Sequence, residues 1–93
     1  MAMQFSLSTA AQVFSMGPGE SFNLVTLSNK HVYRIQNYGP ATIRLDWDAP
    51  PGLPPLSLEA GRAIDLEVTR LDVAIPSTPL SGPYAVGCYW LLG

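Results

Sequence analysis

The chain of 93 residues has little charge, because only 13 % of its residues are Asp, Glu, Lys or Arg. An ordinary soluble domain has about 25 %. Lysine occurs once, at Lys30, although exposed surfaces and strand edges usually carry lysine. A domain this small has a large surface for its volume and should be richer in charge than average. We therefore expect another protein chain to cover part of its surface. The alternative is a monomer covered by uncharged polar side chains.

Cysteine and histidine are also scarce. Cys88 is the only cysteine and His31 the only histidine, which excludes an internal disulfide and a His/Cys metal cluster. Cys88 lies in the most apolar stretch of the chain, which predicts a buried and unreactive thiol. His31 follows a turn at Asn29 and Lys30, where a solvated histidine is expected rather than a catalytic base. We expect no cofactor.

Basic runs and long hydrophobic runs are absent. The net charge is −2, and without a basic patch we expect no nucleic-acid partner. No stretch approaches the roughly 18 apolar residues of a membrane span, so we expect no membrane partner. The first residues carry no positive charge and no continuous apolar core, so they do not read as a secretion signal. The sequence thus predicts a protein kept in a reducing compartment, the cytoplasm of the producing cell.

Catalytic motifs are missing too. There is no Gly-x-Ser-x-Gly elbow and no phosphate-binding loop. Asp46 and Asp48 share one face of an expected strand, about 6.5–7 Å apart, a separation that suits two Ca²⁺ ligands or the acid and base of a glycosidase. Arg44 precedes them on the same face and offers a plain salt bridge instead. We expect a charged exposed face and a protein that is not an enzyme.

Apolar residues alternate with polar ones between turns at intervals of roughly ten residues. The clearest case is Ile43, Leu45 and Trp47. This pattern predicts one all-β domain over residues 1–93, a small antiparallel β-sandwich of jelly-roll or immunoglobulin-like type with about 7–8 short strands. The expected strands cover residues 3–7, 12–16, 22–27, 31–37, 42–48, 63–68, 71–75 and 84–92, and Leu56 and Leu58 are expected to lead into a turn at residues 59–62. Near Val25 the apolar set shifts by one position, which indicates a β-bulge or a strand buried on both faces.

Two stretches resemble each other. Gly39-Pro40 opens a strand that ends at Trp47, and Gly82-Pro83 opens one that ends at Trp90, with the same spacing. Flanking similarities extend the units to residues 17–48 and 59–92. The similarity reflects either internal duplication of a three-strand unit or the general pattern of strands and turns. In both cases we expect the two tryptophans near related ends of the core.

Residues 49–55 contain four prolines and cannot enter a sheet. They predict a stiff, extended loop that projects Leu53. Such a loop serves either as a crossover between two halves of a sandwich or as a docking arm.

Low charge, stiff loops and a last strand that is apolar on both faces favour a structural protein that assembles with itself or docks on a larger scaffold. We expect the last strand and the N-terminal strand to form the interface, with candidate residues Phe5, Leu53, Tyr84, Tyr89 and Leu91. The alternative is a lectin-like module that binds carbohydrate through Tyr38, Tyr84 and Tyr89 with the Asp46/Asp48 face. A small inhibitor of another protein would need a protein-contact surface of the same kind.

The pattern Asn-x-Gly-x-x-x-Ile-x-Leu spans residues 37–45, and Ile64-Asp65-Leu66 follows a later Gly-centred turn. This arrangement, over residues 31–75, is similar to small β-sandwich accessory proteins of phage virions, which decorate capsids or seat fibres. The resemblance implies a non-enzymatic role in stabilising a particle such as a capsid, as a symmetric homo-oligomer located in the virion. It assigns no role to any single residue.

Overall fold

The computed structural model of the chain describes residues 11–53, 55–75 and 84–93. Within these ranges all regular structure is β-strand, so the predicted all-β class is confirmed. The strands are β1 (Gln12–Met16), β2 (Ser21–Pro40), β3 (Ile43–Trp47), β4 (Leu56–Leu58), β5 (Ala63–Ala74) and β6 (Ala85–Leu91). The predicted N-terminal strand, residues 3–7, lies outside the described residues.

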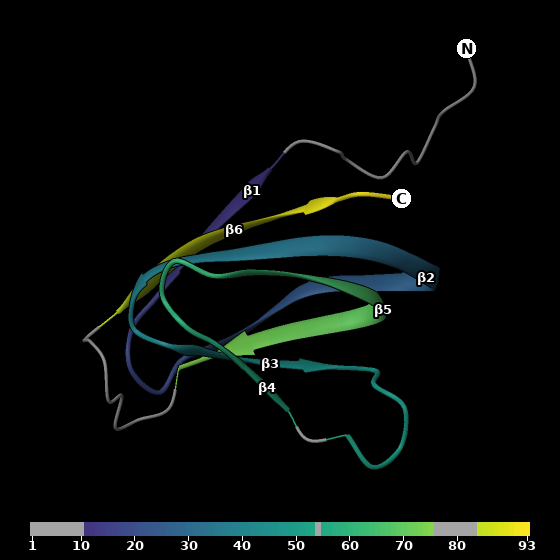
Figure 1. Cartoon of the computed structure of the whole chain (residues 1–93), viewed down its shortest axis with the longest axis horizontal. Coiled ribbons are helices and arrows are strands. Elements are labelled where there is room, and N and C mark those ends of the chain that lie inside the picture. Colours follow the sequence, from purple (N-terminus) through teal and green to yellow (C-terminus); the bar gives the residue numbers. More distant parts are fainter. Residues whose placement is uncertain (1–10, 54, 76–83) are drawn as a thin grey trace.

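The strands form one six-stranded sheet in the order β1-β6-β2-β5-β3-β4 (Figure 1). Every neighbouring pair is antiparallel. The two long strands β2 and β5 occupy the centre of this order, and the short strands β1 and β4 occupy its ends. The sheet is therefore open, with an edge at β1 and another at β4.

The long ribbon of β2 and β5 bends back on itself, which Figure 1 shows at the end where both labels stand. At the bend Thr26 pairs with Arg70, whereas His31 already pairs with Val68. Residues 27–30 of β2 therefore lie opposite the single residue Thr69 of β5, so β2 is longer than β5 by three residues at the bend. The sequence predicts a turn at residues 28–30. Because β2 pairs with β5 both before and after these residues, the chain remains one strand.

For the described residues, the number of predicted strands is consequently too high. The expected strands 22–27 and 31–37 are the two halves of β2, and the expected strands 63–68 and 71–75 are the two halves of β5. The phase shift near Val25 is a β-bulge, as one of the two interpretations held, because the register with β5 slips between Asn23 and Val25. Val25 is buried as a result.

The core lies on one face of the sheet, and it is the inner face of both halves of the bent ribbon. In β5, Leu66 and Val68 are buried before the bend and Leu71 and Val73 after it, so the alternation changes phase at the bend. That change keeps both halves facing inward. The largest fully buried apolar side chains come from β2, β3, β5 and the residue after β5: Ile35, Ile43, Leu45, Val68, Leu71, Val73 and Ile75.

One buried polar side chain, Asn37, joins the end of β2 to its neighbours. Its Nδ2 donates to the carbonyl oxygens of Ala41 at 2.9 Å and Leu58 at 2.8 Å, and its Oδ1 accepts from the backbone N–H of Gly39 at 2.8 Å. Gly39 has φ +83°, and a Cβ there would lie 2.5 Å from the Cβ of Ala60. Only glycine fits this turn, which explains the Gly-Pro signal that precedes β3.

The two tryptophans do not occupy related positions. Trp47, at the end of β3, packs against the core. Trp90 pairs with Arg34 and lies beside it on the outer face of the sheet. The expectation that both sit near related ends of the core is wrong for Trp90, because the alternation in β6 puts Gly87 and Tyr89 inside. Gly82 and Pro83 lie outside the described residues.

Candidate functional site

The two members of the predicted acidic pair, Asp46 and Asp48, have different surroundings and different roles. Asp48 accepts hydrogen bonds at the bend of β5 from the N–H of Thr69 at 2.8 Å, the hydroxyl of Thr69 at 2.8 Å and the N–H of Arg70 at 3.1 Å. Burial raises the pKa of Asp48, but the hydrogen bonds from Thr69 and Arg70 outweigh it and lower the pKa to about 2. Asp48 is thus an ionised clamp that holds the bend of β5.

Asp46 lies on the solvent side of β3, where its side chain is 63 % exposed. The cation within reach is Arg70, whose Nη2 lies 3.8 Å from Asp46 Oδ1, rather than the expected Arg44. Arg70 also pairs with Asp72. The described part of the chain contains no group of three or more His, Cys, Asp and Glu side chains that could hold a metal ion.

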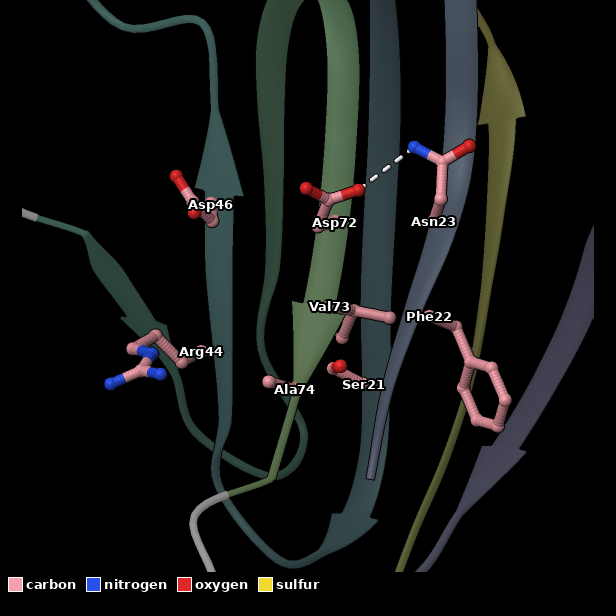
Figure 2. A pocket seen from close by; sticks show the side chains of 8 residues that line it. All are labelled: Ser21, Phe22, Asn23, Arg44, Asp46, Asp72, Val73 and Ala74. Carbon is pink, nitrogen blue, oxygen red and sulfur yellow. Dashed lines mark hydrogen bonds between the residues drawn. The ribbon is translucent and has the colours of Figure 1, made fainter. Parts of the chain in front are cut away.

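A polar trough of about 410 Å³ lies beside these residues on the outer face of β3, the second half of β5 and the first half of β2 (Figure 2). Register aligns Asn23, Asp72 and Asp46 in one row across the three strands. The amide of Asn23 donates to Asp72 Oδ1 at 2.8 Å and accepts from the hydroxyl of Thr26 at 2.8 Å. Asn23 and Asp72 thus bind each other and Arg70 compensates the carboxylates, whereas Arg44 at the same trough takes part in no ion pair among the described residues.

A second hollow, of about 570 Å³, lies on the opposite half of the sheet and is lined by Trp90 with Arg34, Gln36, Ala63, Ile64 and Asp65. Arg34 donates to Asp65 through Nε at 2.6 Å and Nη2 at 3.0 Å. The hydrogen bond from Arg34 holds the pKa of Asp65 below its usual value. We call this the Trp90 hollow. It combines an aromatic ring with amide, carboxylate and guanidinium groups.

The same half of the sheet carries an apolar patch, which we call the outer apolar face: Val13, Tyr38, Val86 and Cys88. Val13 pairs with Cys88 across β1 and β6, and its side chain is 75 % exposed. The hydroxyl of Tyr38 lies 3.5 Å from Cys88 Sγ, and this hydrogen bond raises the pKa of Tyr38. Cys88 is therefore buried, as predicted, although it lies on the outside of the sheet, and its thiol forms no disulfide.

The predicted interface residues do not come together. Tyr84 is exposed directly before β6, and Leu53 is exposed in the proline-rich loop after β3. In Figure 1 this loop and the start of β6 lie at opposite ends of the view. Tyr89 and Leu91 lie on the inner face of β6 and pack against the core. The ring centroid of Tyr89 is 6.5 Å from that of Phe14 and 6.3 Å from that of Tyr33. Phe5 lies outside the described residues.

Sequence reasoning missed Val13 and Val86. In β6 apolar residues occupy both faces, so periodicity does not identify the inner one. The signal lies in Gly87, because a Cβ there would be 2.4 Å from the Phe14 ring. A glycine in close contact with an aromatic side chain marks the inner face, and its neighbours Val86 and Cys88 must then point outward.

No helix in the described part of the chain is long and apolar enough to cross a membrane. No family model and no curated protein matches the chain. Among solved structures, the chain is similar to a de novo designed double-stranded β-helix determined by solution NMR, with a TM-score of 0.63 and 17 % sequence identity. The match covers 90 % of this chain and 100 % of the designed one. At this identity the likeness concerns the fold alone.

Proposed function

We propose that this chain is a non-enzymatic structural protein that assembles through protein–protein contacts made by the outer apolar face. The observation that carries the proposal is the exposure of Val13 and Tyr38, at 75 % and 58 %, on either side of Cys88 in a patch whose members carry no charge. Clustered apolar side chains on a surface of low charge are typical of protein contacts. The edge strand β1 contributes Val13, so a partner could also contact that edge.

We further infer that the bent sheet forms the two packed layers of a jelly roll. One layer would contain β1, β6, the second half of β2 and the first half of β5. The other would contain the first half of β2, the second half of β5, β3 and β4. The observed pairings and the likeness to a designed double-stranded β-helix support this arrangement. The outer apolar face would then cover one side of the first layer.

The proposed assembly is a homo-oligomer bound to a larger scaffold. The similarity of residues 31–75 to accessory proteins of phage virions favours a capsid or a fibre base as that scaffold. On this proposal the protein acts in the virion or in the cytoplasm where virions assemble.

The test is the mass of the chain in solution, measured by light scattering over a dilution series. Val13→Asp places a charge within the outer apolar face and should dissociate the oligomer, because a carboxylate buried at an interface without a partner is unfavourable. Ser57→Asp, on the exposed face of β4, is the matched control and should leave the mass unchanged. A wild-type chain that remains monomeric at all concentrations would contradict self-assembly.

A second candidate function is carbohydrate binding at the Trp90 hollow. Sugar rings stack on aromatic side chains and hydrogen-bond to amide and charged groups, and Trp90, Gln36 and the Arg34–Asp65 pair supply both. Screening a glycan array with the wild type and Trp90→Ala tests this alternative. Binding that disappears in the variant would support it, and no binding to any glycan would remove it.

A further inference from the structure

The sheet ends in two edge strands, β4 and β1, that differ in how well they are protected against pairing with another chain. β4 has three residues, Leu56–Leu58, and Pro54 and Pro55 precede it in the sequence. Short edge strands and prolines are two of the devices by which proteins prevent a further strand from adding to a sheet. The β4 edge is therefore a poor template for a partner strand.

The edge strand β1 has none of these devices. It consists of five residues, Gln12–Met16, without proline and without any charged residue. Its register with β6 runs from Gln12 opposite Tyr89 to Met16 opposite Ala85 without a bulge, so the strand is regular. Among the described residues, no strand pairs with its other side. The backbone N–H and C=O groups on that side are thus arranged to pair with a further strand.

We infer that the β1 edge pairs in antiparallel orientation with the β1 edge of a second copy of the chain, with Phe14 at the centre of the pair. This inference rests on the proposed self-assembly and identifies the contact through which two copies join. In an antiparallel pair, residues on the same side of the sheet must lie opposite each other. The register centred on Phe14 meets this condition over the full length of the strand, and it places Val13 opposite the partner's Ser15.

The composition of β1 supports a second copy as the occupant. Because the strand is uncharged, a two-fold pair of identical strands brings no like charges together, and a partner that recognises its target by charge has nothing to bind at this edge. The two-fold axis of such a pair is perpendicular to the sheet, so the outer sides of both copies face the same way. Val13 is exposed on that side. The two outer apolar faces therefore join into one larger surface for the proposed scaffold.

Pairing at β1 also limits the size of the assembly. The contact uses the same edge of both copies, so it closes with two chains. The remaining edge, β4, lies at the opposite end of the strand order and is short. The expected species is therefore a dimer rather than an open row of sheets.

Complementary charges across the proposed pair test its register, with light scattering over a dilution series as the measurement. Val13→Asp and Ser15→Lys should each weaken the dimer about tenfold or more, because both copies carry the substitution and neither charge gains a partner. A mixture of the two variants places the introduced carboxylate opposite the introduced ammonium group. The mixed dimer should therefore be about tenfold more stable than either homodimer.

Ser57→Lys, on the exposed side of the other edge strand, is the matched control. It should leave the mass of the otherwise wild-type chain unchanged, and it should not restore association when mixed with Val13→Asp. Amide hydrogen exchange tests the backbone contact in the wild type. The exchange of amides in Gln12–Met16 should slow as the protein concentration rises, whereas the exchange of amides in Leu56–Leu58 should not change.

The inference is overturned if the mixture of Val13→Asp and Ser15→Lys associates no more tightly than either variant alone, or if exchange in β1 is independent of concentration. Nuclear Overhauser contacts within one chain between residues 1–10 and the β1 edge would overturn it as well. If the wild type is nevertheless an oligomer, the proposed assembly stands and its contact lies elsewhere. A wild type that is monomeric at all concentrations would remove both the assembly and this contact.

Discussion

Two parts of the outer surface of the bent sheet have opposite chemistry. The outer surface over β3, the second half of β5 and the first half of β2 is polar, and its groups bind one another: Asn23 with Asp72, and Arg70 with both Asp72 and Asp46. The outer apolar face, over β1, β6 and the second half of β2, has one internal polar contact, between Tyr38 and Cys88. Polar groups that bind one another or water need no protein partner, whereas exposed Val13 and Tyr38 gain from one. The low overall charge of the chain therefore favours a protein contact chiefly at the outer apolar face.

The largest expected effect distinguishes the two sides of β6. Tyr89→Asp and Leu91→Asp each place a carboxylate against the core, so the free energy of unfolding should fall by about 3 kcal/mol or more. Val13→Asp, on the outer side of the neighbouring strand, should change it by about 0.5 kcal/mol or less. Urea denaturation followed by tryptophan fluorescence measures all three. Equal stability of the three variants would mean that β6 does not face inward at Tyr89 and Leu91.

The inner face of β6 was not predictable from the sequence alone. Strict alternation identified β3 almost to the residue, because one side of this strand is polar. β6 has apolar residues on both sides, so the choice depends on Phe14 of β1, which fits over Gly87. The two bent strands were divided into four for a related reason. Turn residues at 28–30 mark the bend, but only pairing with a distant strand shows that the ladder continues.

The next effect concerns the polar side, where Asp48 holds the bend of β5. Asp48→Ala removes three hydrogen bonds and leaves the N–H groups of Thr69 and Arg70 without their acceptor. We expect a loss of about 2–3 kcal/mol of unfolding free energy, measured by urea denaturation. Asp46→Ala, two residues earlier, is the control and should cost about 0.5 kcal/mol or less, since exposed ion pairs contribute little. Similar losses of unfolding free energy in both variants would contradict the different roles of Asp46 and Asp48.

The role of Asp48 was not visible in the sequence for a physical reason. A carboxylate two positions after another on a strand resembles a ligand pair as long as its surroundings are unknown. The groups that bind Asp48 are at positions 69 and 70, and they approach only because β5 bends there. The acidic pattern thus identified Asp48 as a residue of interest, but its role as a clamp depends on the fold, which brings Thr69 and Arg70 to it.

Acid should weaken the same clamp. The pKa of Asp48 is lowered from 3.8 to about 2 in the folded protein, so its contribution to stability is complete above pH about 4 and is lost as the pH falls toward about 2. Asp65, whose pKa Arg34 lowers, contributes in the same direction. The melting temperature of the wild type should therefore fall over this range. The decrease should be smaller in Asp48→Asn, and identical curves for the two proteins would exclude the clamp as its source.

The smallest expected effect is on the apolar side, where Tyr38 covers Cys88. Tyr38→Ala should expose the thiol, and the reaction of Cys88 with a disulfide reagent should accelerate, while the free energy of unfolding changes by about 1 kcal/mol or less because Tyr38 is already 58 % exposed. Tyr84→Ala, also exposed but without contact to the thiol, is the control. If a partner chain covers the outer apolar face, then Cys88 of the wild type should also react faster on dilution, as the oligomer dissociates. Reactivity that is independent of protein concentration would mean that Tyr38 alone protects the thiol, and the face would be uncovered even at high concentration.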